Sequence, residues 1–150
     1  MEYIHYGHDR FDKGMFDAIK NIPSFTKPNG GLWGSRKNSE YGWKYWCKES
    51  NFHIDLEKSF EFSLKDGARL LTIDSCEKLL NLPRTKIQCN AFLPTFLDFE
   101  RLAENYDAIE VLISEDGYLY REMYGWDCDS ILVMNPDVII QENRIITEKW

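Results

Sequence analysis

Three short segments of the chain contain residues whose types and spacing suit recognition of a polar ligand that carries rings and hydroxyl groups. The first has His5 at the end of an apolar stretch and Gly7 two residues later. An imidazole exchanges hydrogen bonds with a hydroxyl, and a glycine lets a ligand approach the backbone closely. The alternative interpretation is a histidine at a strand end, followed by a turn glycine.

The second segment spans residues 30–36 and places Trp33 among glycines. Neighbours without side chains leave an indole ring unshielded, so the ring can stack on a flat ligand. A cationic ligand would gain more from that contact. The alternative interpretation is a loop whose tryptophan is tucked into the core.

The third segment, residues 126–130, is called the acidic corner here, and it precedes the apolar run Ile131–Met134. Asp127 and Asp129 share one face if the segment is extended. A carboxylate at the mouth of a buried strand can orient a hydroxyl or stabilise a developing cation. The alternative interpretation is a solvated turn before a core strand.

The elements expected to position these segments are short strands, with few helices between them. Alternation of apolar and polar residues or a short apolar run marks each strand. Because strands and helices do not alternate regularly, the sequence predicts an α+β fold with a mixed or antiparallel sheet. Strands are predicted over residues 2–5, 60–64, 68–73, 108–113, 131–134 and 144–146. Residues 32–34 are predicted as a short strand or a turn, and residues 138–140 continue the strand before them or start another.

Helices are predicted where apolar residues recur at helical spacing. Residues 11–22 show that spacing before Pro23, although Gly14 weakens it. A second helix follows Asn38, with Ser39 as its N-cap. Further helices are predicted over residues 74–80, opened by a capping box, and 98–106, whereas residues 118–124 fit either a helix or a strand.

Composition limits the class of protein. The 150 residues are 43% hydrophobic and 29% charged, which is typical of one globular domain over residues 1–150. A net charge of -7 disfavours nucleic acid as a partner and favours a small molecule or a protein. Glu110 is interpreted as a solvent-facing residue on its strand.

The four cysteines show neither a CxxC pair nor the spacing of a zinc site. No leader pattern opens the sequence, and no apolar run reaches the roughly 18 residues of a membrane span. We therefore expect free thiols, no bound metal, no membrane segment and a cytoplasmic protein.

The order of the three segments resembles the ADP-ribosyltransferase family, in its histidine-tyrosine-glutamate (diphtheria-toxin-like) branch. His5 and Gly7 match the first-strand element, and Trp33 or Tyr41 matches the aromatic element. Residues 129–136 match the strand that opens with an acidic residue, with Asp129 at that position. An aspartate stands where the family has a glutamate.

The resemblance implies a split β-sheet core with short helices and an enzyme that uses NAD as its substrate. It implies that His5 and Gly7 hold the dinucleotide and that Trp33 or Tyr41 stacks on nicotinamide. Asp129 would stabilise the ribose cation and Asp127 would orient the acceptor, a protein or a small molecule. The alternative function is a non-catalytic module that keeps the fold and blocks a partner protein.

Overall fold

The computed structural model describes residues 1–23, 25–85 and 96–141, which form a seven-stranded mixed sheet flanked by short helices. The strand order is β4-β5-β6-β2-β1-β3-β7. Only β4 and β5 are parallel, and every other neighbouring pair is antiparallel. The predicted α+β class with a mixed sheet is therefore confirmed. The strands are β1 Tyr3–Tyr6, β2 Leu32–Arg36, β3 Ser59–Leu64, β4 Leu70–Ile73, β5 Ala108–Val111, β6 Ser130–Val133 and β7 Ile139–Gln141.

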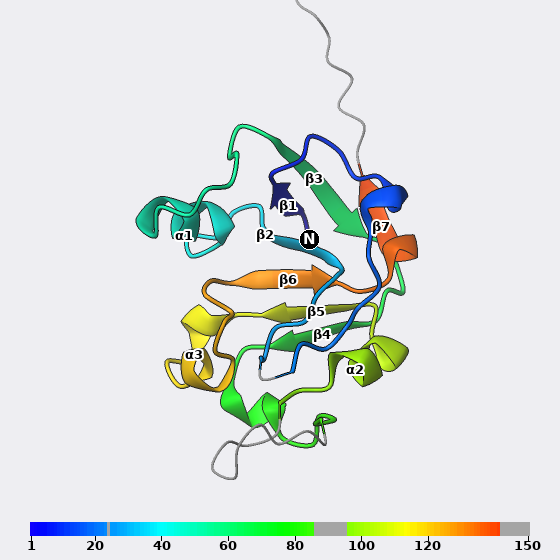
Figure 1. The fold of residues 1–150 in the computed structure, drawn as a ribbon, viewed down its shortest axis with the longest axis vertical. Helices are drawn as coiled ribbons and strands as arrows, with labels where there is room; N and C mark the ends of the chain where they lie inside the picture. The colour runs from blue at the N-terminus through cyan, green and yellow to red at the C-terminus, as the bar shows by residue number, and fades with distance from the viewer. Residues whose placement is uncertain (24, 86–95, 142–150) are drawn as a thin grey trace, which may run out of the picture.

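The sheet twists strongly about its centre. In Figure 1, β4, β5 and β6 lie side by side, whereas β3 and β7 run at a steep angle to them. The strand β2 joins the two parts because it pairs with β6 on one side and β1 on the other. The head of β6 and all of β1 are therefore separated by a single strand.

Buried side chains cover both faces of β5 and β6. Ile109 and Leu132 belong to one hydrophobic cluster, and Ile131 and Val133 belong to another. Successive residues of a strand point to opposite faces, so these apolar strands must be covered on both sides. The first cluster also contains Trp126, which anchors the acidic corner in the core.

Three α-helices and four 3-10 turns complete the described part of the chain. Asp98 caps the second helix by accepting from the backbone of Arg101. The helices are α1 Trp43–Glu49, α2 Phe99–Asn105 and α3 Leu119–Glu122, and the 3-10 turns span Lys13–Met15, Cys76–Leu79, Ile113–Glu115 and Pro136–Val138. None of the helices in this part combines the length and the apolar character that crossing a membrane requires.

The predicted helix over residues 11–22 is wrong. Only a 3-10 turn forms there, and Phe16 is already extended after it. The apolar residues do not share one face, because Phe16 packs against one core cluster and Ile19 belongs to the other. Lys20 then forms an isolated bridge with Asn29.

Two other helix starts differ from the prediction. The helix α1 begins at Trp43, after Gly42, and Ser39 does not cap it. The predicted helix at residues 74–80 is a 3-10 turn, in which Asp74 binds Lys78 at 2.9 Å instead of capping. Cys47, Cys76 and Cys128 are free thiols, as predicted. Cys89 and the strand expected at residues 144–146 lie outside the described residues.

Candidate functional site

The first candidate residue, His5, lies on β1 and binds the backbone of β2. Its Nδ1 atom is 2.6 Å from the carbonyl oxygen of Trp33. A carbonyl only accepts, so Nδ1 carries the proton. The Nε2 atom lies 2.8 Å from Nδ1 of His8 and accepts from it. Burial lowers the pKa of His5, and the neighbouring His8 lowers it further, which favours this neutral form.

Gly7 ends β1 in a conformation that suits glycine. Its φ is 106°, in the left-handed region where other residues are strained. Its N–H donates to the carbonyl of Lys58 at 2.8 Å. The backbone N–H of Gly7 is thus bonded within the protein, and the positive φ lets the chain turn at this point.

The indole of Trp33 is half-buried among aromatic rings. Its centroid lies 4.8 Å from that of Trp126 and 6.4 Å from that of Trp43 on α1. The neighbouring glycines are required by packing: a Cβ atom on Gly31 would lie 2.5 Å from Leu132. Trp33 therefore matches neither interpretation of the sequence fully, because part of its ring is packed in the core and part is accessible to solvent.

Lys27 was missed in the sequence, and it contacts this aromatic group. Its ammonium lies 4.7 Å from the ring centroid of Trp33 and 5.0 Å from that of Trp43. Both distances are typical of cation–π contacts. No sequence signal marks Lys27, because the rings that flank it come from β2 and α1, and a lone lysine in a loop is usually solvated.

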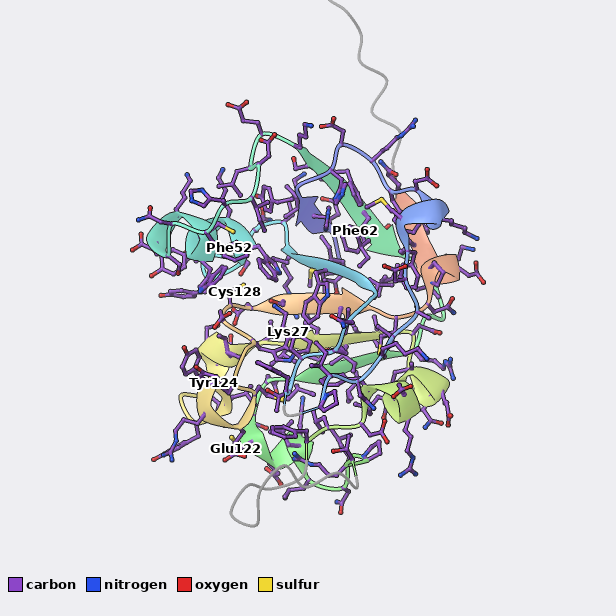
Figure 2. All side chains as sticks on the ribbon, in the orientation of Figure 1. Lys27, Phe52, Phe62, Glu122, Tyr124 and Cys128 are labelled. Atoms are coloured by element: carbon purple, nitrogen blue, oxygen red, sulfur yellow. The ribbon has the colours of Figure 1, made fainter. Side chains whose placement is uncertain are left out.

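The loop that carries Lys27 is fastened to the acidic corner. The buried Nε1 atom of Trp126 donates to the carbonyl of Thr26 at 2.6 Å. The hydroxyl of Thr26 donates in turn to the carbonyl of Tyr124. Figure 2 shows Lys27 and Cys128 near β6, and Tyr124 beside α3.

Burial lowers the pKa of Lys27, whereas the negative charge of Asp127 opposes that shift. Asp127 is half-buried, and of the two corner carboxylates it is the one whose charge affects the pKa of this ammonium. Burial raises the pKa of the Cys128 thiol to about 12, so this thiol is neutral at pH 7. Lys27 thus interacts electrostatically with one carboxylate and with two indole rings.

Asp129 is 8% exposed and held firmly. Its two carboxylate oxygens accept from Ser114, one from the backbone at 2.9 Å and one from the hydroxyl at 2.5 Å. Its own carbonyl accepts from the hydroxyl of Ser35 at 2.9 Å, and the same hydroxyl accepts from the backbone of Trp43. Ser35 thus joins β2, α1 and the acidic corner.

Asp129 lines a groove of about 590 Å³ together with Tyr41, Arg36 and Ser114. Tyr41 is half exposed, and its carbonyl accepts from the backbone of Asp129 at 3.0 Å. His5, Gly7 and Trp33 do not line this groove. The groove beside Asp129 is therefore lined by a carboxylate, a guanidinium and a phenol ring.

The interpretation of Glu110 as a solvent-facing residue is wrong. It is 1% exposed, on β5, and both its oxygens accept from Arg36 of β2, at 2.7 and 2.8 Å. A bidentate pair of this kind compensates a buried carboxylate. Arg36 lines the groove, and the pair with Glu110 holds its guanidinium in place.

The six predicted site residues fall into two neighbouring groups. His5, Gly7 and Trp33 lie on or beside β1 and β2, and Lys27 links Trp33 with Asp127. Asp129 and Tyr41 share the groove. Among the residues that the structure describes, no group of three or more His, Cys, Asp and Glu side chains is placed to hold a metal ion.

The chain was compared with protein-family models, with curated proteins and with solved structures, and none of the three comparisons found a match.

Proposed function

We propose that the protein transfers ADP-ribose from NAD to an acceptor and releases nicotinamide. One observation carries the proposal: β6, β2 and β1 are adjacent in the sheet, so the acidic corner, Trp33 and His5 stand on three consecutive strands. His5 and Trp33 are 28 residues apart in sequence, and Ser35 and Asp129 are 94 residues apart, yet a hydrogen bond joins each pair.

The reaction breaks the bond between the ribose C1′ atom and the nicotinamide nitrogen. The bonding electrons leave with nicotinamide, positive charge develops on the ribose, and the acceptor loses a proton as it bonds to C1′. Glycoside cleavage has the same kind of transition state, which a nearby carboxylate stabilises. The proposal assigns nicotinamide to the half-buried ring of Trp33, in place of the Lys27 ammonium that lies over it, and a ribose hydroxyl to Nε2 of His5, in place of His8.

Asp129 is the first choice for the stabilising carboxylate. The two bonds from Ser114 fix its orientation, which is the pre-organisation that electrostatic catalysis needs. Asp127 is the second choice, because it is half-buried in the same acidic corner and its charge acts on Lys27, whose ammonium lies over Trp33. Tyr41, in the groove with Asp129, remains the alternative to Trp33 as the stacking ring.

The test is incubation of the protein with NAD that carries a label on its adenosine part. Release of nicotinamide is followed by chromatography, and transfer is followed by label on candidate acceptors. Asp129→Ala and Asp127→Ala are compared with Asp66→Ala, which removes an exposed carboxylate in a turn outside the acidic corner. Loss in one corner variant supports the proposal, and absence of nicotinamide release from the wild type contradicts it.

A second function, a non-catalytic module that binds a partner protein, is favoured by a group of tyrosines at α3. Tyr118, Tyr120 and Tyr124 are 73%, 47% and 68% exposed. Tyrosine is enriched in the energetic centres of protein interfaces. This function predicts a protein complex that Tyr124→Ala weakens and Asp129→Ala leaves intact, with no NAD consumed.

A further inference from the structure

The groove of about 590 Å³ beside Asp129 has more carboxylates than cations in its lining. Among the described residues, its charged side chains are four carboxylates and two cations: Glu2, Glu40, Glu115 and Asp129, and Arg36 and Lys37. Both cations already pair with carboxylates of the protein. Arg36 binds Glu110, and the ammonium of Lys37 lies 3.2 Å from Glu61 and 3.5 Å from Glu2. The lining of the groove therefore carries unbalanced negative charge.

The imbalance extends into the interior, where one guanidinium lies near two buried carboxylates. Glu110 is 1% exposed and accepts both hydrogen bonds of the pair with Arg36. Asp129 is 8% exposed and forms no ion pair within the part of the chain that the structure describes. The bonds to Glu110 raise the pKa of Arg36, and the charge of Asp129 adds to this rise through space. Buried carboxylates are usually paired with a cation, so Asp129 is suited to pair with one from another molecule.

Hydrogen bonds orient Asp129 without supplying that positive charge. Each of its two oxygens accepts one hydrogen bond from Ser114, one from the backbone and one from the hydroxyl. A carboxylate has about four lone-pair sites, so both oxygens can accept again. Tyr41 is half exposed and lines the same groove, and the face of a phenol ring attracts a cation. An oriented carboxylate and an accessible aromatic ring are thus available to one ligand.

We infer that this groove binds the cationic end of an arginine or lysine side chain of a partner protein, with that end next to Asp129. A guanidinium and an ammonium are both pure donors, which suits a carboxylate with unused lone pairs. The exposed carboxylates of Glu40 and Glu115 attract a cation from solution towards the groove. This binding requires no NAD, and only the assignment of the bound side chain to the acceptor rests on the proposed function.

Titrations of the whole protein, followed by the NMR signals of its backbone amides, test the groove with three probes. N-acetyl-arginine amide and N-acetyl-lysine amide carry the cation, and N-acetyl-citrulline amide is a neutral compound of the same shape as the first. Asp129→Asn removes the buried charge and keeps the size of the side chain. The double variant Glu40→Gln with Glu115→Gln removes two exposed charges of the groove. Glu57→Gln, at an exposed position outside the groove, is the matched control.

Wild type and Glu57→Gln are expected to show saturable shifts at Ser114 and Tyr41 with about millimolar concentrations of at least one cationic probe, and the affinity falls as salt is added. Replacing the arginine probe by the citrulline probe is expected to weaken binding about tenfold or more, as is Asp129→Asn. The double variant is expected to weaken binding about twofold to fivefold. The cationic probe that binds more tightly identifies the group as a guanidinium or an ammonium.

Three results would overturn the inference: neither cationic probe shifts these signals, the citrulline probe binds as tightly as the arginine probe, or Asp129→Asn binds as the wild type does. Thermal unfolding of each variant verifies that it is folded. If Asp129→Asn does not fold, an unchanged affinity in the double variant overturns the inference instead.

The cation-binding groove and the proposed function fail in different ways. Charge-dependent binding of a cationic probe without any release of nicotinamide from NAD keeps the groove and refutes the transferase. Release of nicotinamide by a wild type that binds neither cationic probe keeps the transferase and refutes the groove.

Discussion

The Nδ1 atom of His5 donates to the carbonyl oxygen of Trp33 across a distance of 2.6 Å. This bond ties the imidazole of β1 to the strand that carries Trp33, and it fixes which nitrogen of His5 holds the proton. The other nitrogen accepts from His8. A ligand hydroxyl that binds Nε2 of His5 must therefore displace His8, so His8→Ala is a variant that frees this atom.

The pH dependence of stability follows from the same histidine. Burial lowers the pKa of His5 below 6.5, so the unfolded chain binds more protons than the folded one in the window below that value. We predict that the free energy of unfolding decreases as the pH falls from about 7 through 6.5. Urea unfolding at several pH values measures this slope. His5→Asn keeps a donor for the carbonyl of Trp33 and is expected to reduce the slope of the unfolding free energy against pH. His53→Asn, at an exposed position, is the control. An identical slope in both variants contradicts the assignment.

Ser35 is expected to stabilise both α1 and the acidic corner. Its hydroxyl is 2% exposed and bonds to the backbone of Trp43 and of Asp129. Ser35→Ala leaves a buried N–H and a buried carbonyl each with one fewer partner, at a cost of about 1–3 kcal/mol. Denaturant unfolding measures this loss, with Ser63→Ala on β3 as the control. A change below about 0.5 kcal/mol would show that the two groups find other partners.

Arg36 is predicted to stabilise the sheet through Glu110. Arg36→Ala leaves the carboxylate of Glu110 buried without its partner, and such losses cost about 3–5 kcal/mol. The double variant with Glu110→Gln is expected to recover part of the loss, because no unpaired charge remains buried. Arg101→Ala, at an exposed position of α2, is the control. Equal unfolding free energies for wild type and Arg36→Ala would contradict this role.

Asp107 is predicted to contribute stability that acid removes. Hydrogen bonds from the side chain and backbone of Arg69, and from Asn135, lower its pKa to about 2. The unfolded carboxyl titrates near 3.9, so its contribution is present above that pH and is lost as the pH falls towards 2. Because Arg69 is half exposed, we expect about 1–2 kcal/mol. Acid unfolding of Asp107→Asn lacks this component if the assignment is correct.

Local patterns in the sequence predict the elements in which apolar residues recur at the spacing of a strand or a helix. The alternation at residues 60–64 and the apolar run at 131–134 correspond to β3 and β6, and the helix predicted over residues 98–106 corresponds to α2. The helix over residues 11–22 was wrong because helical spacing of apolar residues also arises when successive residues pack against two different cores.

Charged residues that pair across the sheet could not be predicted in this way. Glu110 and Arg36 are 74 residues apart, and nothing near either one in sequence indicates a bidentate pair. Lys27 gains its place from rings on β2 and α1, and from the bond between Trp126 and Thr26. The sequence identified Trp33 and Asp127 as candidate residues. Only the tertiary fold shows that Lys27 contacts the ring of Trp33 and that the charge of Asp127 affects the pKa of Lys27.

The rate of nicotinamide release from NAD tests the central claim most directly, measured for wild type, Asp129→Ala, Asp127→Ala and Asp66→Ala at equal concentrations of folded protein. We predict release by wild type and Asp66→Ala, and a rate lower by about 100-fold or more in the corner variant whose carboxylate faces the ribose. No release by the wild type, or equal rates in all four proteins, would contradict the claim that the acidic corner is the catalytic end of an NAD site.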